Sequence, residues 1–261
     1  MRVDPRSHSF RVAERRISKA IEKRYGMVWR DSMKTVFITG ADRGIGNAMC
    51  EQFLEHGWKV FAGQFMPRWG FLSKNLERYP NDLKLIPLDV SKDESVRAAA
   101  ALVAQETDEL DMLINCAGIG LGDGCAQNLA TFQVNTLGPI RMTEAFLPLM
   151  QKGMKRLCFV SSEAGSIALA HRSDSFSYCM SKSALNMAVK LMFNELRPKG
   201  YTFRLYHPGW VNGYMEGDTP STEGKYQPED TAMVSYRQFT EALPCEDVLV
   251  MRDIEGQCWS F

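Results

Sequence analysis

An apolar run leads directly into a glycine-rich turn at Thr35-Val36-Phe37-Ile38-Thr39-Gly40-Ala41-Asp42-Arg43-Gly44-Ile45-Gly46. The β-branched and aromatic residues at its start predict a buried strand over 35–39, and helical periodicity follows over 45–55. Glycines between a strand and a helix allow a tight turn and let a pyrophosphate approach the backbone, where the helix N-terminus offers free N–H groups. We therefore predict a dinucleotide-binding turn, with an ordinary tight turn as the alternative.

Strands and helices alternate along the rest of the chain. Further strands are predicted at 58–63, 83–88, 112–115, 156–161, 202–206 and 247–251, and further helices at 72–78, 93–106, 127–151, 176–197 and 228–242. Near-continuous apolar strands separated by helices are typical of a parallel sheet covered on both faces. The predicted fold class is therefore α/β, a doubly wound, Rossmann-like parallel sheet of about seven strands. Its ligand crevice is expected at the carboxyl ends of the strands.

The bulk composition fits one large domain preceded by a short extension. The chain has 261 residues and balanced charge, 31 basic against 31 acidic, which gives no general attraction for nucleic acid. Residues 1–34 hold ten basic and four acidic residues, a net charge of +6. We predict a flexible basic extension at 1–33, with a short amphipathic helix as the alternative, and a catalytic domain at 34–261.

Seven dispersed cysteines contain no CxxC pair, and the four histidines show no metal-ligand spacing. We therefore expect free thiols in a reducing, cytoplasmic compartment and no metal site. No apolar run is long enough to span a bilayer, and no apolar stretch follows the basic N-terminus as it would in a signal peptide.

Tyr178 and Lys182 are the residues most indicative of chemistry. Residues four apart share one face of a helix, so an ammonium group is expected beside the phenol. A neighbouring positive charge favours the phenolate and lowers the phenol pKa, which would make Tyr178 a usable proton donor and acceptor. Taken alone, such a pair is more often an exposed surface pair.

The end of the second strand favours NADP(H) over NAD(H). An acidic residue there would hold the ribose 2′-hydroxyl of NAD, but the strand ends at Gly63-Gln64-Phe65. Arg43 and Arg68 could instead meet a 2′-phosphate bidentately. After the third strand, Asp89 is placed to accept from the adenine amine with Val90 beside the ring, although a solvated loop carboxylate explains Asp89 equally well.

Taken in order, the motifs resemble those of the short-chain dehydrogenase/reductase family in its compact single-domain form. They are Thr39-Gly40 with Gly44 and Gly46, Asn115-Cys116-Ala117-Gly118, Asn135, Ser162, Tyr178 with Lys182, and Pro208-Gly209. The resemblance covers about residues 34–261. It implies an NAD(P)-dependent oxidoreductase, such as a carbonyl reductase, that moves hydride between NADP(H) and a small carbonyl or alcohol substrate.

The resemblance also implies a role for each matching residue. Tyr178 is the expected acid/base, Lys182 lowers its pKa and holds the nicotinamide ribose, and Ser162 hydrogen-bonds to the substrate oxygen. Asn135 holds a water that links Lys182 to solvent. The predicted cofactor-binding set is Gly40, Asp42, Arg43, Gly44, Ile45, Gly46, Asp89, Val90, Asn115, Ala117, Gly118, Tyr178, Lys182, Pro208, Gly209 and Val211.

Several features depart from the family pattern or stay open. The span from Ser162 to Tyr178 is longer than usual, and its extra segment at 171–174 is expected at the rim of the pocket. Helix 176–197 is apolar nearly all round, so it is buried inside the monomer or in an interface. Relatives usually pair through this helix, which predicts a homodimer or homotetramer. A sensor that binds NAD(P) without turnover is the alternative function, and an isomerase or lyase is a third.

Overall fold

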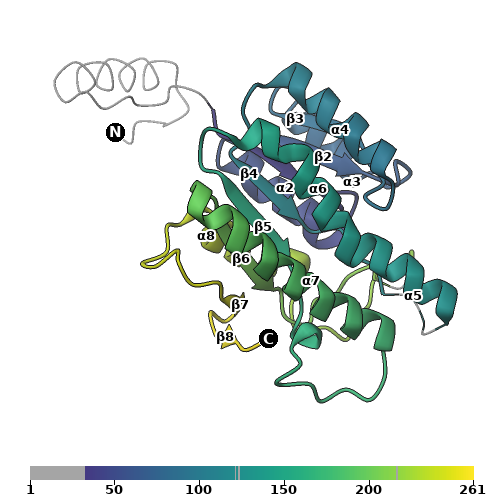
Figure 1. Ribbon diagram of the computed structural model, residues 1–261. Coiled ribbons are helices and arrows are strands. Elements are labelled where there is room, and N and C mark those ends of the chain that lie inside the picture. Colours follow the sequence, from purple (N-terminus) through teal and green to yellow (C-terminus); the bar gives the residue numbers. More distant parts are fainter. Residues whose placement is uncertain (1–32, 121, 123, 216) are drawn as a thin grey trace, which may run out of the picture. The chain divides into compact units, whose positions relative to one another are not determined.

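The computed structural model describes residues 33–120, 122, 124–215 and 217–261. The predicted N-terminal extension, apart from Met33, lies outside these residues. Lys34–Phe261 forms one compact unit, shown in Figure 1. This unit confirms the predicted Rossmann-like α/β fold.

The described part of the chain forms one eight-stranded sheet in the order β3-β2-β1-β4-β5-β6-β7-β8. The strands are β1 (Thr35–Ile38), β2 (Lys59–Gln64), β3 (Leu83–Pro87), β4 (Met112–Asn115), β5 (Arg156–Val160), β6 (Thr202–His207), β7 (Met251–Asp253) and β8 (Cys258–Trp259). Neighbouring strands pair in parallel except β7 with β8. The chain runs outward from β1 to β3 and then returns to β4, so strand order reverses between β1 and β4. A ligand crevice is expected at such a switch point.

Helices cover both faces of the sheet. They are α2 (Gly44–Glu55), α3 (Phe71–Arg78), α4 (Asp93–Glu106), α5 (Cys125–Phe132), α6 (Gly138–Phe146), α7 (Phe176–Leu196) and α8 (Pro228–Thr240), with the shorter helical segments η1 (Gln133–Leu137), η2 (Leu147–Met150), η3 (Glu163–Gly165) and η4 (Arg197–Lys199). Side chains of α4, α6 and α7 build one apolar core with the sheet, and side chains of α2, α3 and α8 build the other. Both faces of the sheet are therefore buried under helices, and strands buried on both faces are apolar along their whole length.

Two predicted elements differ from the structure. The sequence pattern predicts a last strand at 247–251, but β7 begins at Met251 and is followed by β8, which raises the strand count from about seven to eight. The short β8 is an edge strand whose Trp259 indole donates to Asp253 (2.9 Å) in the neighbouring strand β7. The single helix predicted over 127–151 is divided by the π-helical segment η1, which contains Asn135.

Candidate active site

The glycine turn lies between β1 and α2, at the carboxyl edge of the sheet. Gly40 has φ +66°, and a Cβ there would lie 2.8 Å from the Ala117 Cα. A Cβ at Gly46 would lie 2.1 Å from the Gly40 carbonyl oxygen. Only glycine fits these two positions. Gly44 has φ +55° but open space in front of it, because a Cβ there would meet only one Tyr214 ring carbon, at 3.8 Å. A ligand can therefore approach the start of α2 at this point.

Thr39 and Asp42 tie the turn to its neighbours. The Thr39 hydroxyl oxygen accepts from the backbone N–H groups of Cys116 and Ala117 (both 2.9 Å). The Asp42 carboxylate accepts from the N–H groups of Phe65 (3.0 Å) and Met66 (2.8 Å), just after β2. Asp42 is among the predicted cofactor contacts. Its buried carboxylate is bonded to the segment after β2, so a contact with the cofactor would be made by the Asp42 backbone.

Two arginines meet beyond the end of β2, in the predicted 2′-phosphate position. The Arg43 guanidinium stacks over Trp69 (4.7 Å to the ring centroid) and donates to the Tyr214 carbonyl (3.0 Å). Arg68 also lies over Trp69 (5.9 Å). Both guanidiniums pair with the carboxylate of Asp218, a residue that the sequence did not single out.

The segment after β4 brings the turn close to Lys182. The Asn115 side chain is buried, and neither its amide oxygen nor its nitrogen has a protein partner. Buried amides are normally hydrogen-bonded, so Asn115 is suited to bind polar groups of a ligand. A Cβ on Gly118 would lie 3.7 Å from the Lys182 Nζ, and Ala117 packs against the Gly40 backbone.

Asp89 and Val90 lie between β3 and α4. The Asp89 carboxylate accepts from the Ser91 N–H (2.9 Å) and hydroxyl (2.6 Å), and Val90 packs against Gly138 at the start of α6. These contacts order the loop before α4. A contact between Asp89 and the adenine amine stays a prediction.

Tyr178 and Lys182 lie one turn apart near the start of α7 and face the end of β5. Lys182 is buried, its Nζ donates to the Val160 carbonyl (2.9 Å), and it lies 5.7 Å from the Tyr178 ring centroid. Ser162, which directly follows β5 and Ser161, lies near enough to Tyr178 for its hydroxyl to lower the pKa of the phenol. The fold therefore brings together Ser162, Tyr178 and Lys182, as predicted from their order in the sequence.

The expected low pKa of Tyr178 is not found in the free protein. Burial raises the pKa of Tyr178 to about 12, and the nearby Ser162 hydroxyl offsets this only in part. Burial also lowers the pKa of Lys182 to about 8. Desolvation of both groups therefore outweighs the attraction between ammonium and phenolate that the spacing of the two residues suggests.

Asn135 links α7 to the segment after β4. Its amide nitrogen donates to the Ile119 carbonyl (2.9 Å) and the Ser181 hydroxyl (3.0 Å), and its oxygen accepts from the Ile119 N–H (2.9 Å). The π-helical turn around it carries one extra residue per turn, a distortion that is frequent at functional sites. Protein partners take both amide hydrogens and one of the two acceptor positions of the Asn135 oxygen, and the water at Asn135 stays a prediction.

The loop after β6 completes the crevice. Gly209 has φ +79°, and a Cβ there would lie 2.8 Å from two ring carbons of Tyr226. The Pro208 carbonyl accepts from the Thr231 hydroxyl (3.1 Å), and Val211 forms a β-bridge with Tyr226. These contacts fix the bend that carries Pro208, Gly209 and Val211 away from the sheet.

Glu163 is a site residue that sequence reasoning missed. Its carboxylate accepts from the Ser162 hydroxyl (2.6 Å), pairs with Arg172, and lies 3.6 Å from the Nε2 atom of His207. Burial alone would raise the pKa of Glu163, but Ser162, His207 and Arg172 together lower it. The carboxylate is therefore ionised beside Ser162. Its place directly after Ser162 was the only available signal.

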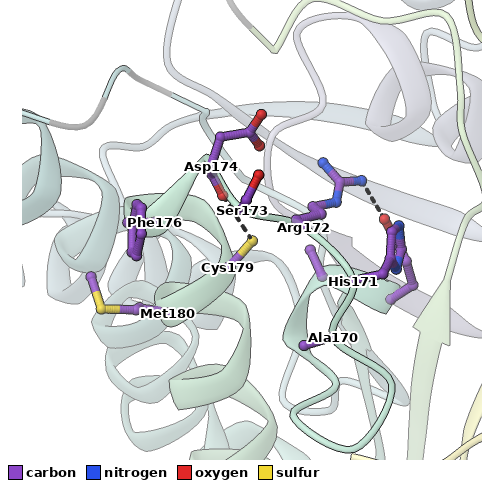
Figure 2. A pocket seen from close by; sticks show the side chains of 10 residues that line it. Ala170, His171, Arg172, Ser173, Asp174, Phe176, Cys179 and Met180 are labelled. Carbon is purple, nitrogen blue, oxygen red and sulfur yellow. Dashed lines mark hydrogen bonds and ion pairs between the residues drawn. The ribbon is translucent and has the colours of Figure 1, made fainter.

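A cavity of about 140 Å³ opens beside this group (Figure 2). Glu163 and Ala164 line one part of it, the predicted rim segment 171–174 another, and the first turns of α7 contribute Phe176, Cys179 and Met180. Polar and apolar side chains thus meet next to the Ser162–Tyr178 pair. The extra segment at 171–174 lines this cavity, and its place at the rim of the substrate pocket stays a prediction.

The fold and site together define a Rossmann-like α/β protein. Its sheet edge carries a glycine turn, an unpartnered buried amide and a Ser-Tyr-Lys group. Among the described residues, no cluster of His, Cys, Asp and Glu could hold a metal, and no helix there is long and apolar enough to cross a bilayer.

Comparison with known proteins identifies the family. A family description, short chain dehydrogenase, matches residues 34–224. C-signal of Myxococcus xanthus is 44% identical over 118 residues, which cover 42% of this chain and 71% of that protein. An uncharacterized oxidoreductase of Schizosaccharomyces pombe is 30% identical over 232 residues, which cover 84% and 88%. The solved structure of NADPH-bound carbonyl reductase from chicken fatty liver is similar with a TM-score of 0.77 and 27% identity, covering 88% of this chain and 99% of that one.

The chain therefore belongs to the short-chain dehydrogenase family. This is a family of oxidoreductases, which supports a dehydrogenase or reductase role and a nicotinamide cofactor.

Proposed function

We propose that this protein is an NADP(H)-dependent carbonyl reductase or alcohol dehydrogenase in which Tyr178 is the acid/base. The observation that carries the proposal is the convergence of Ser162, Tyr178 and Lys182 at the same sheet edge as the glycine turn. Carbonyl reduction needs a hydride donor on one side of the carbonyl and a proton donor at its oxygen. The Tyr178 phenol is the proposed proton donor at the carbonyl oxygen.

The residues at the sheet edge fit a nicotinamide dinucleotide. The start of α2, with open space at Gly44, suits the pyrophosphate, and the unpartnered amide of Asn115 suits ribose or base groups. Ala117 and Gly118 would flank the adenosine ribose, and Lys182 would hold the nicotinamide ribose. Pro208, Gly209 and Val211 would lie beside the nicotinamide ring, which supplies the hydride when bound.

A preference for NADP(H) is supported by the Arg43 and Arg68 guanidiniums. They lie together beyond β2 and already hold one anionic group, the Asp218 carboxylate. β2 ends at Gln64, so the strand end itself supplies no acidic residue to select a free ribose 2′-hydroxyl, and the nearby Asp42 carboxylate is bonded to the Phe65 and Met66 N–H groups.

In the proposed reaction Tyr178 gives its proton to the carbonyl oxygen. Its raised pKa keeps the phenol protonated at neutral pH, which suits the reductive direction. Ser162 would position the same oxygen, and Lys182 would stabilise the phenolate left behind, because its pKa of about 8 keeps it largely charged at neutral pH. The cavity beside Glu163 is the proposed substrate pocket. Five of the described cysteines, Cys50, Cys116, Cys158, Cys245 and Cys258, are free thiols, which supports the proposed cytoplasmic location.

The test is oxidation of NADPH, followed by absorbance, across aldehydes, ketones, diketones and quinones, with NADH in parallel. A Tyr178→Phe variant should bind NADPH normally but lose activity by about 100-fold or more. Tyr201→Phe is the matched control, because the Tyr201 hydroxyl bonds to Gln151, which lies outside the candidate site. Saturable NADPH binding without turnover of any carbonyl or alcohol would contradict the enzyme proposal and favour the sensor alternative.

A further inference from the structure

Asp218 connects the loop after β6 to the two arginines. Its carboxylate is 2.7 and 2.8 Å from the Arg68 Nη2 and 3.4 Å from the Arg43 Nη1. Asp218 is 150 positions from Arg68 and 175 from Arg43 in sequence, so this contact exists only in the folded protein.

The surroundings preorganise the two arginines. Trp69 lies under both guanidiniums, and the Tyr214 ring packs edge-on against Trp69 (5.2 Å between centroids). Arg43 is largely buried by these contacts, with 19% of its side chain exposed, whereas Arg68 and Asp218 are each 62% exposed. Arg43 is therefore held nearly fixed and Arg68 is open to solvent. Both pair with the exposed Asp218 carboxylate, which a competing anion could displace.

We propose that Asp218 is a cofactor-specificity residue that competes with the 2′-phosphate of NADP(H) for Arg43 and Arg68. The inference rests on the proposed function, because it takes the sheet edge as the cofactor site. A carboxylate and a phosphate both match the planar fork of a guanidinium, but a phosphate carries more charge and more acceptor oxygens. The phosphate can therefore displace Asp218, while part of its binding free energy is used to break the internal pairs.

NAD(H) has a hydroxyl where NADP(H) has the phosphate, so it can bind without disturbing Asp218. Asp218 therefore reduces the preference for NADP(H) that the two arginines alone would give. The same competition affects the loop after β6, which carries Asp218. Two other contacts hold this loop: Arg43 donates to the Tyr214 carbonyl, and the Met215 carbonyl accepts from the Gly120 N–H (3.4 Å). Binding of the phosphate would thus release one of the contacts that hold this loop across the crevice.

The test is calorimetric binding of NADPH and NADH to the full-length wild type and an Asp218→Asn variant. Adenosine 2′,5′-bisphosphate and adenosine 5′-monophosphate form a second pair of ligands that differ only in the 2′-phosphate and need no redox chemistry. The variant should bind NADPH and the bisphosphate more tightly by roughly three- to tenfold, the range expected for removing two exposed ion pairs. Affinity for NADH and the monophosphate should change by less than about twofold.

Asp247→Asn is the matched control. Asp247 is an exposed carboxylate that pairs with Arg197 (3.0 Å), so the substitution changes net charge equally at a different place. It should leave the ratio of NADPH to NADH affinity unchanged. An Arg68→Gln variant should weaken NADPH binding and reduce the effect of Asp218→Asn, because one of the two contested cations is gone.

The outcomes separate the two proposals. If the wild type binds NADPH but Asp218→Asn alters NADPH and NADH affinity equally, or matches Asp247→Asn, the specificity inference is wrong and the proposed function stands. If the wild type binds neither NADPH nor NADH, the proposed function fails and the inference fails with it.

Discussion

At the scale of single residues, Glu163 takes the hydroxyl hydrogen of Ser162 that the proposed reaction needs. Ser162 has one hydrogen, and it donates to the ionised Glu163 carboxylate at 2.6 Å, while its oxygen also accepts from the Ala164 N–H (3.2 Å). Ser162 can therefore donate to a Tyr178 phenolate, or to a substrate carbonyl, only by releasing Glu163. Glu163 acts on Tyr178 through space as well, because its negative charge raises the Tyr178 pKa.

A Glu163→Gln substitution should lower the pKa of Tyr178 by about one unit. The variant removes a negative charge, and its neutral amide oxygen holds the Ser162 hydrogen less strongly than the carboxylate does, so both changes favour the phenolate. Carbonyl reduction requires the protonated phenol, so activity is lost as pH rises through the Tyr178 pKa. The alkaline fall in kcat/KM should therefore begin at lower pH in the variant than in the wild type.

The matched control for this experiment is Asp174→Asn, which removes a carboxylate at the rim of the same cavity. Arg172, Cys179 and Lys182 are the other charged or titratable groups near Tyr178, and all three are intact in the two variants. An alkaline limb that stays in place, or moves to higher pH, in Glu163→Gln would show that Glu163 does not tune Tyr178.

Lys182 is a buried cation whose ionisation costs the folded state stability. Its pKa is about 8 instead of 10.5, so between these values the unfolded chain binds more protons than the folded one, and stability rises with pH across that window. Lys182→Met should therefore be more stable than the wild type at pH 7 by about 2 kcal/mol, after allowing about 1 kcal/mol for the lost bond to the Val160 carbonyl.

Urea denaturation at pH 7 and at about pH 9.5, inside the window between the two pKa values, measures this effect. The advantage of Lys182→Met should shrink at the higher pH, since the wild-type lysine is then largely neutral in the folded state. Activity should be lost at both pH values. A variant that is less stable than the wild type at pH 7 would show that the lysine contributes more to packing than its charge costs.

The sequence predicted which polar residues meet, but not how they are bonded. Ser162, Tyr178 and Lys182 come together because each occupies a fixed place relative to a strand end or a helix face. Glu163 and Asp218 were not predicted as site residues because the sequence does not show which side chains the fold brings to them. Asp218, for example, pairs with Arg43, which is 175 positions away. The pKa of Tyr178 was misjudged because spacing reveals a neighbouring charge but not the burial that opposes it.

At the scale of elements, the glycines between β1 and α2 have two different roles. Gly40 and Gly46 are needed for folding, and Gly44 is available for binding a ligand. Gly46→Ala should destabilise the fold by about 3 kcal/mol, since its Cβ would overlap the Gly40 carbonyl. Gly44→Ala should cost only about 1–2 kcal/mol for its positive φ, but weaken NADPH binding by about tenfold.

Thermal denaturation and NADPH titration of both variants test this division. The two substitutions add the same methyl group to the same turn, so each serves as the control for the other. If Gly44→Ala folds and binds NADPH like the wild type, the start of α2 is not the pyrophosphate site.

Local sequence patterns predicted elements best where they were long and buried. The predicted strand at 35–39 and helix at 93–106 lie within a residue of the observed bounds, because their apolar periodicity reflects burial on a sheet face. The π-helical turn at Asn135 and the edge strand β8 were not predicted. Asn135 bonds to Ser181, 46 positions away, and Trp259 bonds to Asp253 in the neighbouring strand β7.

At the scale of the whole molecule, α7 has one face in the core and an apolar face outside it. Leu185, Val189 and Phe193 are buried, whereas Phe176, Met180, Met187 and Leu191 are each at least 45% exposed. The exposed four recur at helical spacing and form one stripe, which we call the α7 outer stripe. Of the two explanations for an apolar helix, burial inside the monomer accounts for only one face, so the outer stripe is the proposed homodimer contact.

A Met187→Glu/Leu191→Glu double variant should therefore convert a dimer into a monomer, because charges at the centre of an apolar contact lose their hydration on association. Light scattering coupled to size-exclusion chromatography measures the mass. Leu102→Glu/Met233→Glu is the matched control, since it introduces the same two charges at apolar side chains that are 40% and 43% exposed on α4 and α8. A monomeric wild type would contradict the proposed homodimer, and a dimer that survives the α7 variant would place the contact elsewhere.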